Sequence, residues 1–202
     1  MRILYSRPKK RSVPNFFIFL SIASASNFIF ALTSVLFSIF ATDMGFSPPE
    51  IGLAISALTA GSLIGGPLWG KLVDKFGKRK IALLVSLSGQ ALFCLLTPLM
   101  KHLLSLVIVR FFFGFFTVAQ ALILNELTVK IEEEERRSKE ISAINVARAA
   151  GYSSGCLLSG ILGDLHPNFS FYLGSLAVIL VFFLTFYLRE ETEAATPLPQ
   201  DK

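Results

Sequence analysis

Long apolar segments alternate with short polar ones along the whole chain. A helix needs about 20 residues to cross the hydrocarbon core of a bilayer. None of the apolar segments alternates with period two, as the strands of a membrane barrel do. Lipid offers no hydrogen-bond partner to a free backbone amide, so each segment is predicted to be a transmembrane helix. The six predicted helices, which form one all-α membrane bundle over 16–188, are 16–41, 51–70, 81–100, 103–124, 141–163 and 171–188.

Basic residues occupy every second polar segment, and this pattern predicts the orientation of the bundle. They precede the first helix, separate the second from the third and the fourth from the fifth, and follow the sixth. The exceptions are Lys101, in another loop, and Arg110 and Arg148, within helices. The positive-inside rule then places both termini in the cytoplasm, as an even number of helices also requires. We expect a basic cytoplasmic N-terminus over 1–15 and a cytoplasmic tail over 189–202.

Composition and charge narrow the class of protein further. The chain is 53% hydrophobic and 16% charged, whereas a soluble domain carries about 25% charged residues. The net charge of +5 comes from membrane boundaries, not from one groove-binding face, so the expected partner is the lipid bilayer and not nucleic acid. Cys94 and Cys156 lack metal-ligand spacing, and no nucleophile elbow or phosphate loop is present. We expect neither an enzyme nor a cofactor.

Two local patterns mark the ends of the second helix. Ser47, followed three residues later by Glu50, matches a capping box at its start. The polar segment after its end begins at Gly70 and reads G-K-L-V-D-K-F-G-K-R-K over 70–80. Gly70 allows close helix packing and Gly77 a tight turn. Asp74, among five cations, is expected to be paired.

This segment resembles the loop motif of the major facilitator superfamily, G-x-L-x-D-[RK]-x-G-[RK]-[RK]. Each defining position matches, and the motif lies where the family has it, between helices two and three on the cytoplasmic side. The resemblance implies a conformational gate, since ion pairs that form in one state can break in another. The implied gate residues are Gly70, Asp74, Lys75, Gly77, Lys78 and Arg79.

The fourth helix supports the same resemblance. Leu106, Arg110 and Gly114 match the family's L-x-x-x-R-x-x-x-G pattern, although Phe113 replaces the polar residue often found before that glycine. An arginine within the membrane is costly unless it faces protein or water, so Arg110 is a functional-site hypothesis. The other interpretation is that Arg110 extends to the outer surface. The resemblance implies a role for this arginine in substrate or proton coupling.

The resemblance also implies a cytoplasmic charge network. Glu126 ends the fourth helix, and either Arg136 or Arg137 follows in the loop. In the family, the corresponding acidic residue and arginine join the aspartate of the loop motif, here Asp74.

The fifth helix departs from the pattern of the family's proton antiporters, G-x-x-x-G-P-x-x-G-G. Cys156 stands for the proline and Ser159 for one glycine, which weakens a drug:proton antiporter interpretation. Asn145, Arg148, Tyr152 and Ser159 share one face of this helix. That face lines an aqueous cavity, or alternatively Arg148 pairs with Glu126 or Asp74.

The family's central cavity is lined by helices one and four, so Asn27 and Gln120 are further substrate candidates. Each of these amides has the alternative of bonding a neighbouring helix. Helices two and five are both rich in glycine, and each lies in the middle of a group of three. This similarity between helices two and five fits two inverted three-helix repeats, as in the N-terminal half of the family fold.

The expected function is secondary active transport of a small solute across the cell membrane by alternating access, with a second six-helix half as partner. Three explanations of the single half stay open: a fragment, a half-transporter that pairs with itself or a separate half, and a diverged protein that does not transport. The alternative function is a non-transporting or channel-like protein that acts as a homo-oligomer.

Overall fold

The structure, a computed structural model, describes residues 13–76, 79–129, 134–163 and 167–186. All regular structure in these ranges is helical. The elements are α1 (Val13–Val35), α2 (Phe37–Asp43), α3 (Pro48–Phe76), α4 (Arg79–Leu96), the 3-10 helix η1 (Thr97–Leu99), α5 (Leu103–Val129), α6 (Glu134–Gly163) and α7 (Pro167–Phe186).

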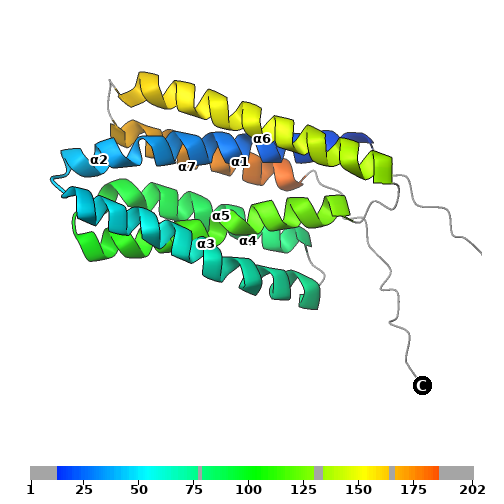
Figure 1. Ribbon diagram of the computed structural model, residues 1–202, viewed down its shortest axis with the longest axis horizontal. Helices are drawn as coiled ribbons and strands as arrows, with labels where there is room; N and C mark the ends of the chain where they lie inside the picture. Colours follow the sequence, from blue (N-terminus) through cyan, green and yellow to red (C-terminus); the bar gives the residue numbers. More distant parts are fainter. Residues whose placement is uncertain (1–12, 77–78, 130–133, 164–166, 187–202) are drawn as a thin grey trace, which may run out of the picture.

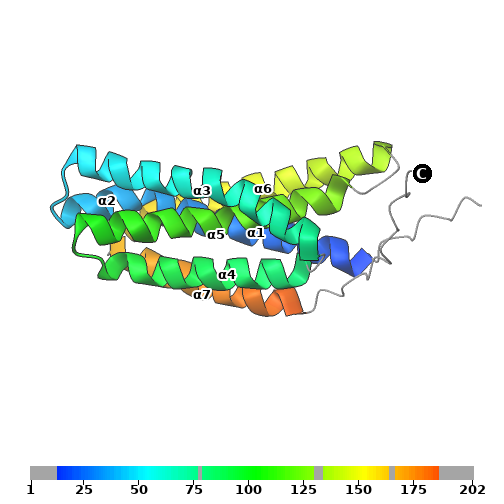
Figure 2. The same cartoon turned by 90° about the horizontal axis from the view of Figure 1, so that it is seen from below.

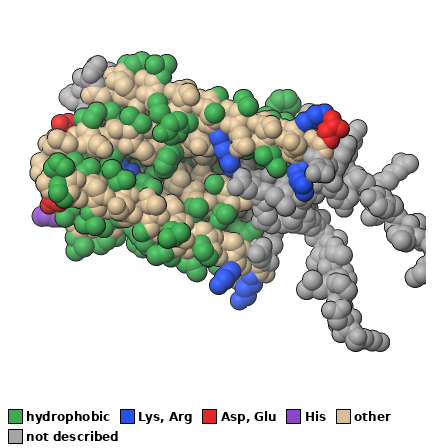
Figure 3. All heavy atoms as spheres, viewed as in Figure 1, with side chains coloured by type: hydrophobic (Ala, Val, Ile, Leu, Met, Phe, Trp, Pro, Cys, Tyr) green, Lys and Arg blue, Asp and Glu red, His purple; other side chains and the backbone are tan. Residues whose placement is uncertain are grey.

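The helices run up and down along one long axis, so the bundle has two distinct ends (Figure 1). We call the end that carries α2, the α2–α3 turn and η1 the α2 end. We call the other end, where α3 and α5 finish and α4 and α6 begin, the basic end. Figure 3 shows that most Lys and Arg side chains on the visible face lie toward the basic end.

The helices begin and end differently from the apolar segments. The segment 16–41 comprises α1 and α2, which meet at an irregular turn at Leu36. The amide of Phe40 still donates to the carbonyl oxygen of Leu36 at 2.9 Å, so the two helices form one continuous span. At the basic end α3 continues past Gly70 to Phe76 and α6 begins at Glu134 rather than Ile141. The helices there are longer than the predicted apolar segments, because apolar sequence marks the lipid boundary, while charged residues continue the helix into water.

Four helices of the described chain are long and apolar enough to cross a membrane. These spans are 16–43, 48–73, 80–99 and 103–122. The apolar part of α7, Phe169–Phe183, is shorter. α6 does not qualify, because polar side chains such as Ser142, Asn145 and Arg148 interrupt its apolar ones. The structure therefore confirms an all-α membrane fold. Of the six predicted transmembrane helices, four are long and apolar enough in the described chain to count as candidate spans.

The bundle has three layers, which Figure 2 shows most clearly. α3 and α6 form one outer layer, α1 and α5 the middle layer, and α4 and α7 the other outer layer. α3 packs along α5 and α6 packs along α1, while α4 contacts both α5 and α7, and α7 contacts α1. Within this bundle α3 and α6 therefore each rest mainly on a single helix.

Glycines bring the helices of both outer pairs into backbone contact. A Cβ on Gly61 would overlap the carbonyl oxygen of Phe111 in α5, and a Cβ on Gly65 would lie 2.9 Å from that of Phe115. Side chains of α3 reinforce this contact, because Ser62 Oγ donates to Gly114 O and Trp69 Nε1 to Phe115 O, each at 3.0 Å.

The pair formed by α6 and α1 repeats this arrangement. A Cβ on Gly151 or on Gly155 would overlap the carbonyl oxygen of Ser24 or of Phe28 in α1, respectively. In both pairs, two glycines four residues apart face two carbonyls four residues apart. The small-residue spacing in the sequence thus corresponds to close helix crossings.

The start of α3 shows one of the two hydrogen bonds of a capping box, the one that Glu50 accepts from the backbone amide of Ser47. The backbone amide and the hydroxyl of Ser47 both donate to Glu50 Oε2 at 2.7 Å. Pro48 occupies the first helical position, where no intrahelical hydrogen bond is lost. The turn before α3 is thereby fixed.

Substituting Gly61 tests the close contact of α3 with α5. We expect Gly61→Ala to lower the free energy of unfolding by about 2 kcal/mol, because the added Cβ meets backbone that a rotamer change cannot move. Reversible unfolding in mixed detergent micelles measures this difference.

Gly66→Ala is the matched control on the same helix, because a Cβ on Gly66 would meet nothing within 4 Å. Its stability is expected to stay level or rise slightly, since alanine favours helix over glycine. Equal losses in the two variants would show that the contact with Phe111 is unimportant.

Candidate functional site

The predicted gate motif begins inside a helix and not in a loop. Gly70 to Phe76 form the last turns of α3, Arg79 begins α4, and Gly77 and Lys78 lie outside the described residues. Val73 is buried in the core cluster that includes Trp69 and Leu83. The side chains of Lys71 and Lys75 are exposed at the basic end. The helix therefore carries the first half of the motif out of the bundle on a rigid support.

The predicted charge network falls largely outside the described side chains. The structure gives only the backbone of Asp74, Arg79, Glu126 and Arg136, and Arg137 is partly exposed. All of these residues belong to helix turns at the basic end, because α3 and α5 finish there and α4 and α6 begin there. Their mutual pairing stays a prediction.

Arg110 points into the protein at the α2 end. Its side chain is 2% exposed. The guanidinium carbon lies 3.3 Å from the centroid of the Phe37 ring, and 5.9 and 6.0 Å from those of Phe113 and Phe171. These distances are in the range of cation–π attraction. The alternative that Arg110 extends to the outer surface is therefore wrong.

We call the three rings of Phe37, Phe113 and Phe171 the aromatic box. α2, α5 and α7 each contribute one ring, and each ring is 1% exposed. Within the described chain, Nε and Nη2 of Arg110 have no hydrogen-bond partner. The box thus encloses the cation by aromatic faces and leaves two of its donors unsatisfied.

Gln120 lies in the contact between α5 and α4. Its Nε2 donates to Gln90 Oε1 at 2.5 Å, and Gln90 Nε2 donates to Thr117 Oγ1 at 3.3 Å. Both glutamines are buried. Of the two interpretations of Gln120, substrate contact and bonding to a neighbouring helix, the structure shows the hydrogen bond to a neighbouring helix.

The polar face of α6 is partly open. Asn145 and Tyr152 are exposed, whereas Arg148 is half-buried and interacts with other residues. Nearer the α2 end Ser159 is fully buried, and its hydroxyl donates to Cys156 O at 2.8 Å. The polar face of α6 is thus exposed in the middle of the helix and buried near the α2 end.

Asn27, the candidate on α1, is half-buried, and its Nδ2 donates to Ala23 O of the same helix at 2.9 Å. The structure therefore brings Arg110, Gln120 and Asn27 to three different surroundings rather than to one shared cluster.

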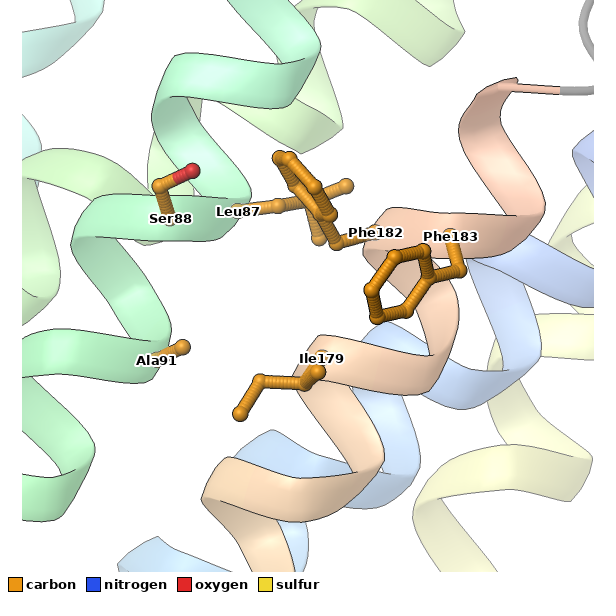
Figure 4. A pocket seen from close by; sticks show the side chains of 6 residues that line it. All are labelled: Leu87, Ser88, Ala91, Ile179, Phe182 and Phe183. Carbon is orange, nitrogen blue, oxygen red and sulfur yellow. The ribbon is translucent and has the colours of Figure 1, made fainter.

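An apolar groove of about 270 Å³ runs between α4 and α7 (Figure 4). Ser88 supplies a hydroxyl to its lining, and that hydroxyl donates to Leu84 O of its own helix at 2.9 Å. The lining contains no charge and none of the predicted site residues, and the convergent polar groups of a solute site are absent from it. It consists of Leu87, Ser88, Ala91, Ile179, Phe182 and Phe183.

Sequence reasoning missed the aromatic box. It identified Arg110 and found no acidic residue at the same depth to pair with it. The available signal was the abundance of phenylalanine, 20 residues in all. Three phenylalanines far apart in sequence meet only when α2, α5 and α7 pack together, and no local pattern shows that they do.

Comparison with known proteins identifies the family of this chain. The sequence model described as Major Facilitator Superfamily matches residues 16–202. The chain therefore belongs to the major facilitator superfamily, a family of membrane transport proteins, and the resemblance seen in its motifs is confirmed.

Curated relatives support this assignment. The chain is 28% identical to the multidrug resistance protein MdtG of Proteus mirabilis over 172 residues, covering 80% of this chain and 41% of that protein. It is 27% identical to a bicyclomycin resistance protein homolog of Haemophilus influenzae, covering 75% of this chain and 38% of the relative. For the class B tetracycline resistance protein of Escherichia coli the identity is 25%, with coverage of 71% and 35%. The chain thus spans about two fifths of the length of these relatives.

Removing one member of the glutamine pair tests its structural role. We expect Gln120→Leu to lower the free energy of unfolding by about 1 kcal/mol, because Gln90 keeps a buried acceptor that has lost its donor. The double variant Gln90→Leu/Gln120→Leu should lose less than the sum of the two single variants. Unfolding of all three variants in detergent measures the coupling, and strictly additive losses would contradict the pairing.

Proposed function

We propose that this chain is the N-terminal six-helix half of a secondary active transporter of the cell membrane. It carries a small organic solute by alternating access and has both termini in the cytoplasm. The observation that carries the proposal is the incomplete packing of α3 and α6, in a chain whose sequence belongs to a transporter family. The names of the relatives, which refer to multidrug, bicyclomycin and tetracycline resistance, suggest drug-like solutes.

The packing pattern supports a half built from two inverted three-helix repeats. Exchanging α1 with α5, α3 with α6 and α4 with α7 converts the α3–α5 contact into the α6–α1 contact and the α4–α5 contact into the α7–α1 contact, and it leaves the α4–α7 contact unchanged. The glycine crossings follow the same exchange, because Gly61 and Gly65 of α3 correspond to Gly151 and Gly155 of α6. The repeats are residues of α1 to α4 and residues of α5 to α7.

The exposed faces of α3 and α6 support a second six-helix half as partner. Leu63 on α3 is 76% exposed and Leu157 on α6 is 71% exposed. A Cβ on Gly66, Gly70 or Gly160 would meet nothing within 4 Å, so these positions leave room for another backbone. The partner is the remaining half of a longer chain or a second copy of this one.

The gate of this transporter is the charge network at the basic end. Asp74, Glu126 and an arginine of the pair Arg136 and Arg137 are carried by three different helix ends. Relative movement of those helices changes which charges pair, and differential pairing biases the two states. The solute contacts the exposed polar face of α6, which carries Asn145, Arg148 and Tyr152. It also contacts Asn27 of α1, and Arg110 is the coupling cation.

The experiment is counterflow of radiolabelled tetracycline into proteoliposomes. It compares the 202-residue chain alone, the chain together with a separately expressed C-terminal half of a relative, and empty liposomes. Saturable counterflow supports the transporter. Flux that rises linearly with concentration supports the channel-like homo-oligomer instead, and its absence in every preparation rejects tetracycline-like solutes as substrates.

Neutralising the acidic residue of the motif tests the gate. We expect Asp74→Asn to lower the rate of counterflow at least tenfold, because an amide cannot pair with the surrounding cations. Asp43→Asn, at an exposed carboxylate of the α2 end, is the matched control and should retain the rate of the unmodified protein. A similar loss in both variants would reject a specific role for Asp74.

A further inference from the structure

Arg110 is a cation held in the interior without a carboxylate among its observed contacts. Burying an unpaired charge in a membrane protein costs several kcal/mol, so some interaction must offset this cost. The closest contact of the guanidinium is its stacking on the Phe37 ring, with 3.3 Å between the guanidinium carbon and the ring centroid. Phe113 and Phe171 lie at the outer limit of the attraction, near 6 Å. Phe37 is therefore the main electrostatic partner of Arg110.

The position of Phe37 in the chain gives this contact a second consequence. Phe37 is the first residue of α2, directly after the irregular turn at Leu36. One turn later, Phe40 packs on Phe171 of α7 with ring centroids 5.0 Å apart. α2 thus contacts the cation of α5 through one ring and α7 through the next.

We propose that Phe37 is the positioning residue of Arg110, and that its ring on the guanidinium locks the α2 end of the bundle shut. While the ring is stacked, the cation is covered and unavailable to a solute. Movement of α2 away from α5 uncovers Nε and Nη2, which have no partner in the described structure and can then bind an acceptor group of a solute or water. The lock rests on the proposed alternating access, in which this end must open and close.

Cys94 provides a reporter that needs neither transport nor a second half. Its side chain is 1% exposed, and its thiol donates to the carbonyl oxygen of Phe171 at 3.3 Å. Cys156 is the other cysteine of the chain. In a Cys156→Ala background, reaction with N-ethylmaleimide therefore reports how often the box opens.

The experiment measures the rate of Cys94 alkylation for the 202-residue chain in lipid nanodiscs. We expect Phe37→Leu to raise this rate about tenfold, because leucine fills much of the same space but offers no π-face to the cation. Phe40→Leu is the matched control, since Phe40 is also buried in the cluster but makes an edge-on ring contact with Phe171. Its rate should rise no more than about threefold, and Phe37→Tyr should keep the original rate.

Removal of the cation isolates the interaction. In an Arg110→Met background, Phe37→Leu and Phe40→Leu should raise the alkylation rate equally. Equal effects of the two leucine variants with Arg110 present would overturn the proposal, and so would a tenfold effect of Phe37→Leu that persists without Arg110.

If the Phe37→Leu variant does not fold, a series of fluorinated phenylalanines at position 37 tests the same contact with the cation. Fluorination weakens the negative face of the ring while nearly keeping its shape, so the rate should rise with each added fluorine. A flat series would overturn the lock. Because alkylation requires no solute, failed counterflow together with a rising series would reject tetracycline-like solutes as substrates and leave the contact of Phe37 with Arg110 intact.

Discussion

Direct contact between helix backbones is the constraint on which the rest of this bundle depends. Lipid competes for every apolar side chain, so helices associate through close packing and hydrogen bonds rather than through exclusion of water. Gly61 and Gly65 bring α3 onto α5, and Gly151 and Gly155 bring α6 onto α1. These two crossings each join one outer helix to one helix of the middle layer, and α4 and α7 link the two pairs through their contacts with α5, with α1 and with each other.

Polar groups within the bundle are accommodated in three different ways. Gln120 donates to Gln90 across the contact of α5 with α4, Thr33 donates to the carbonyl oxygen of Ile29 in its own helix, and Arg110 is covered by rings. Only the last arrangement leaves donors unsatisfied. Among these three arrangements, that of Arg110 is the one whose unsatisfied groups are donors, and they lie at the α2 end, where the proposed opening would expose them.

Much of the architecture could be predicted because it depends on local sequence patterns. The length of the apolar segments predicts the helices, Ser47 and Glu50 predict the start of α3, and the motif that begins at Gly70 indicates the family. Apolar length does not show that α3 continues past Gly70 or that α6 begins at Glu134, because charged residues extend both helices beyond the apolar segments. The aromatic box could not be predicted, because Phe37, Phe113 and Phe171 look like any other apolar residues until three helices place them around one cation.

The polar composition of α6 has a consequence for how the protein is made. α6 is less apolar than the four candidate spans, and within the described chain it packs mainly on α1. α1 is synthesised first, however, and the whole of α3, α4 and α5 follows before Gly151 reaches it. Until then, the carbonyl oxygens of Ser24 and Phe28 lack the glycine contacts that cover them in the finished bundle. The crossing of α1 with α6 is therefore a contact of high sequence separation.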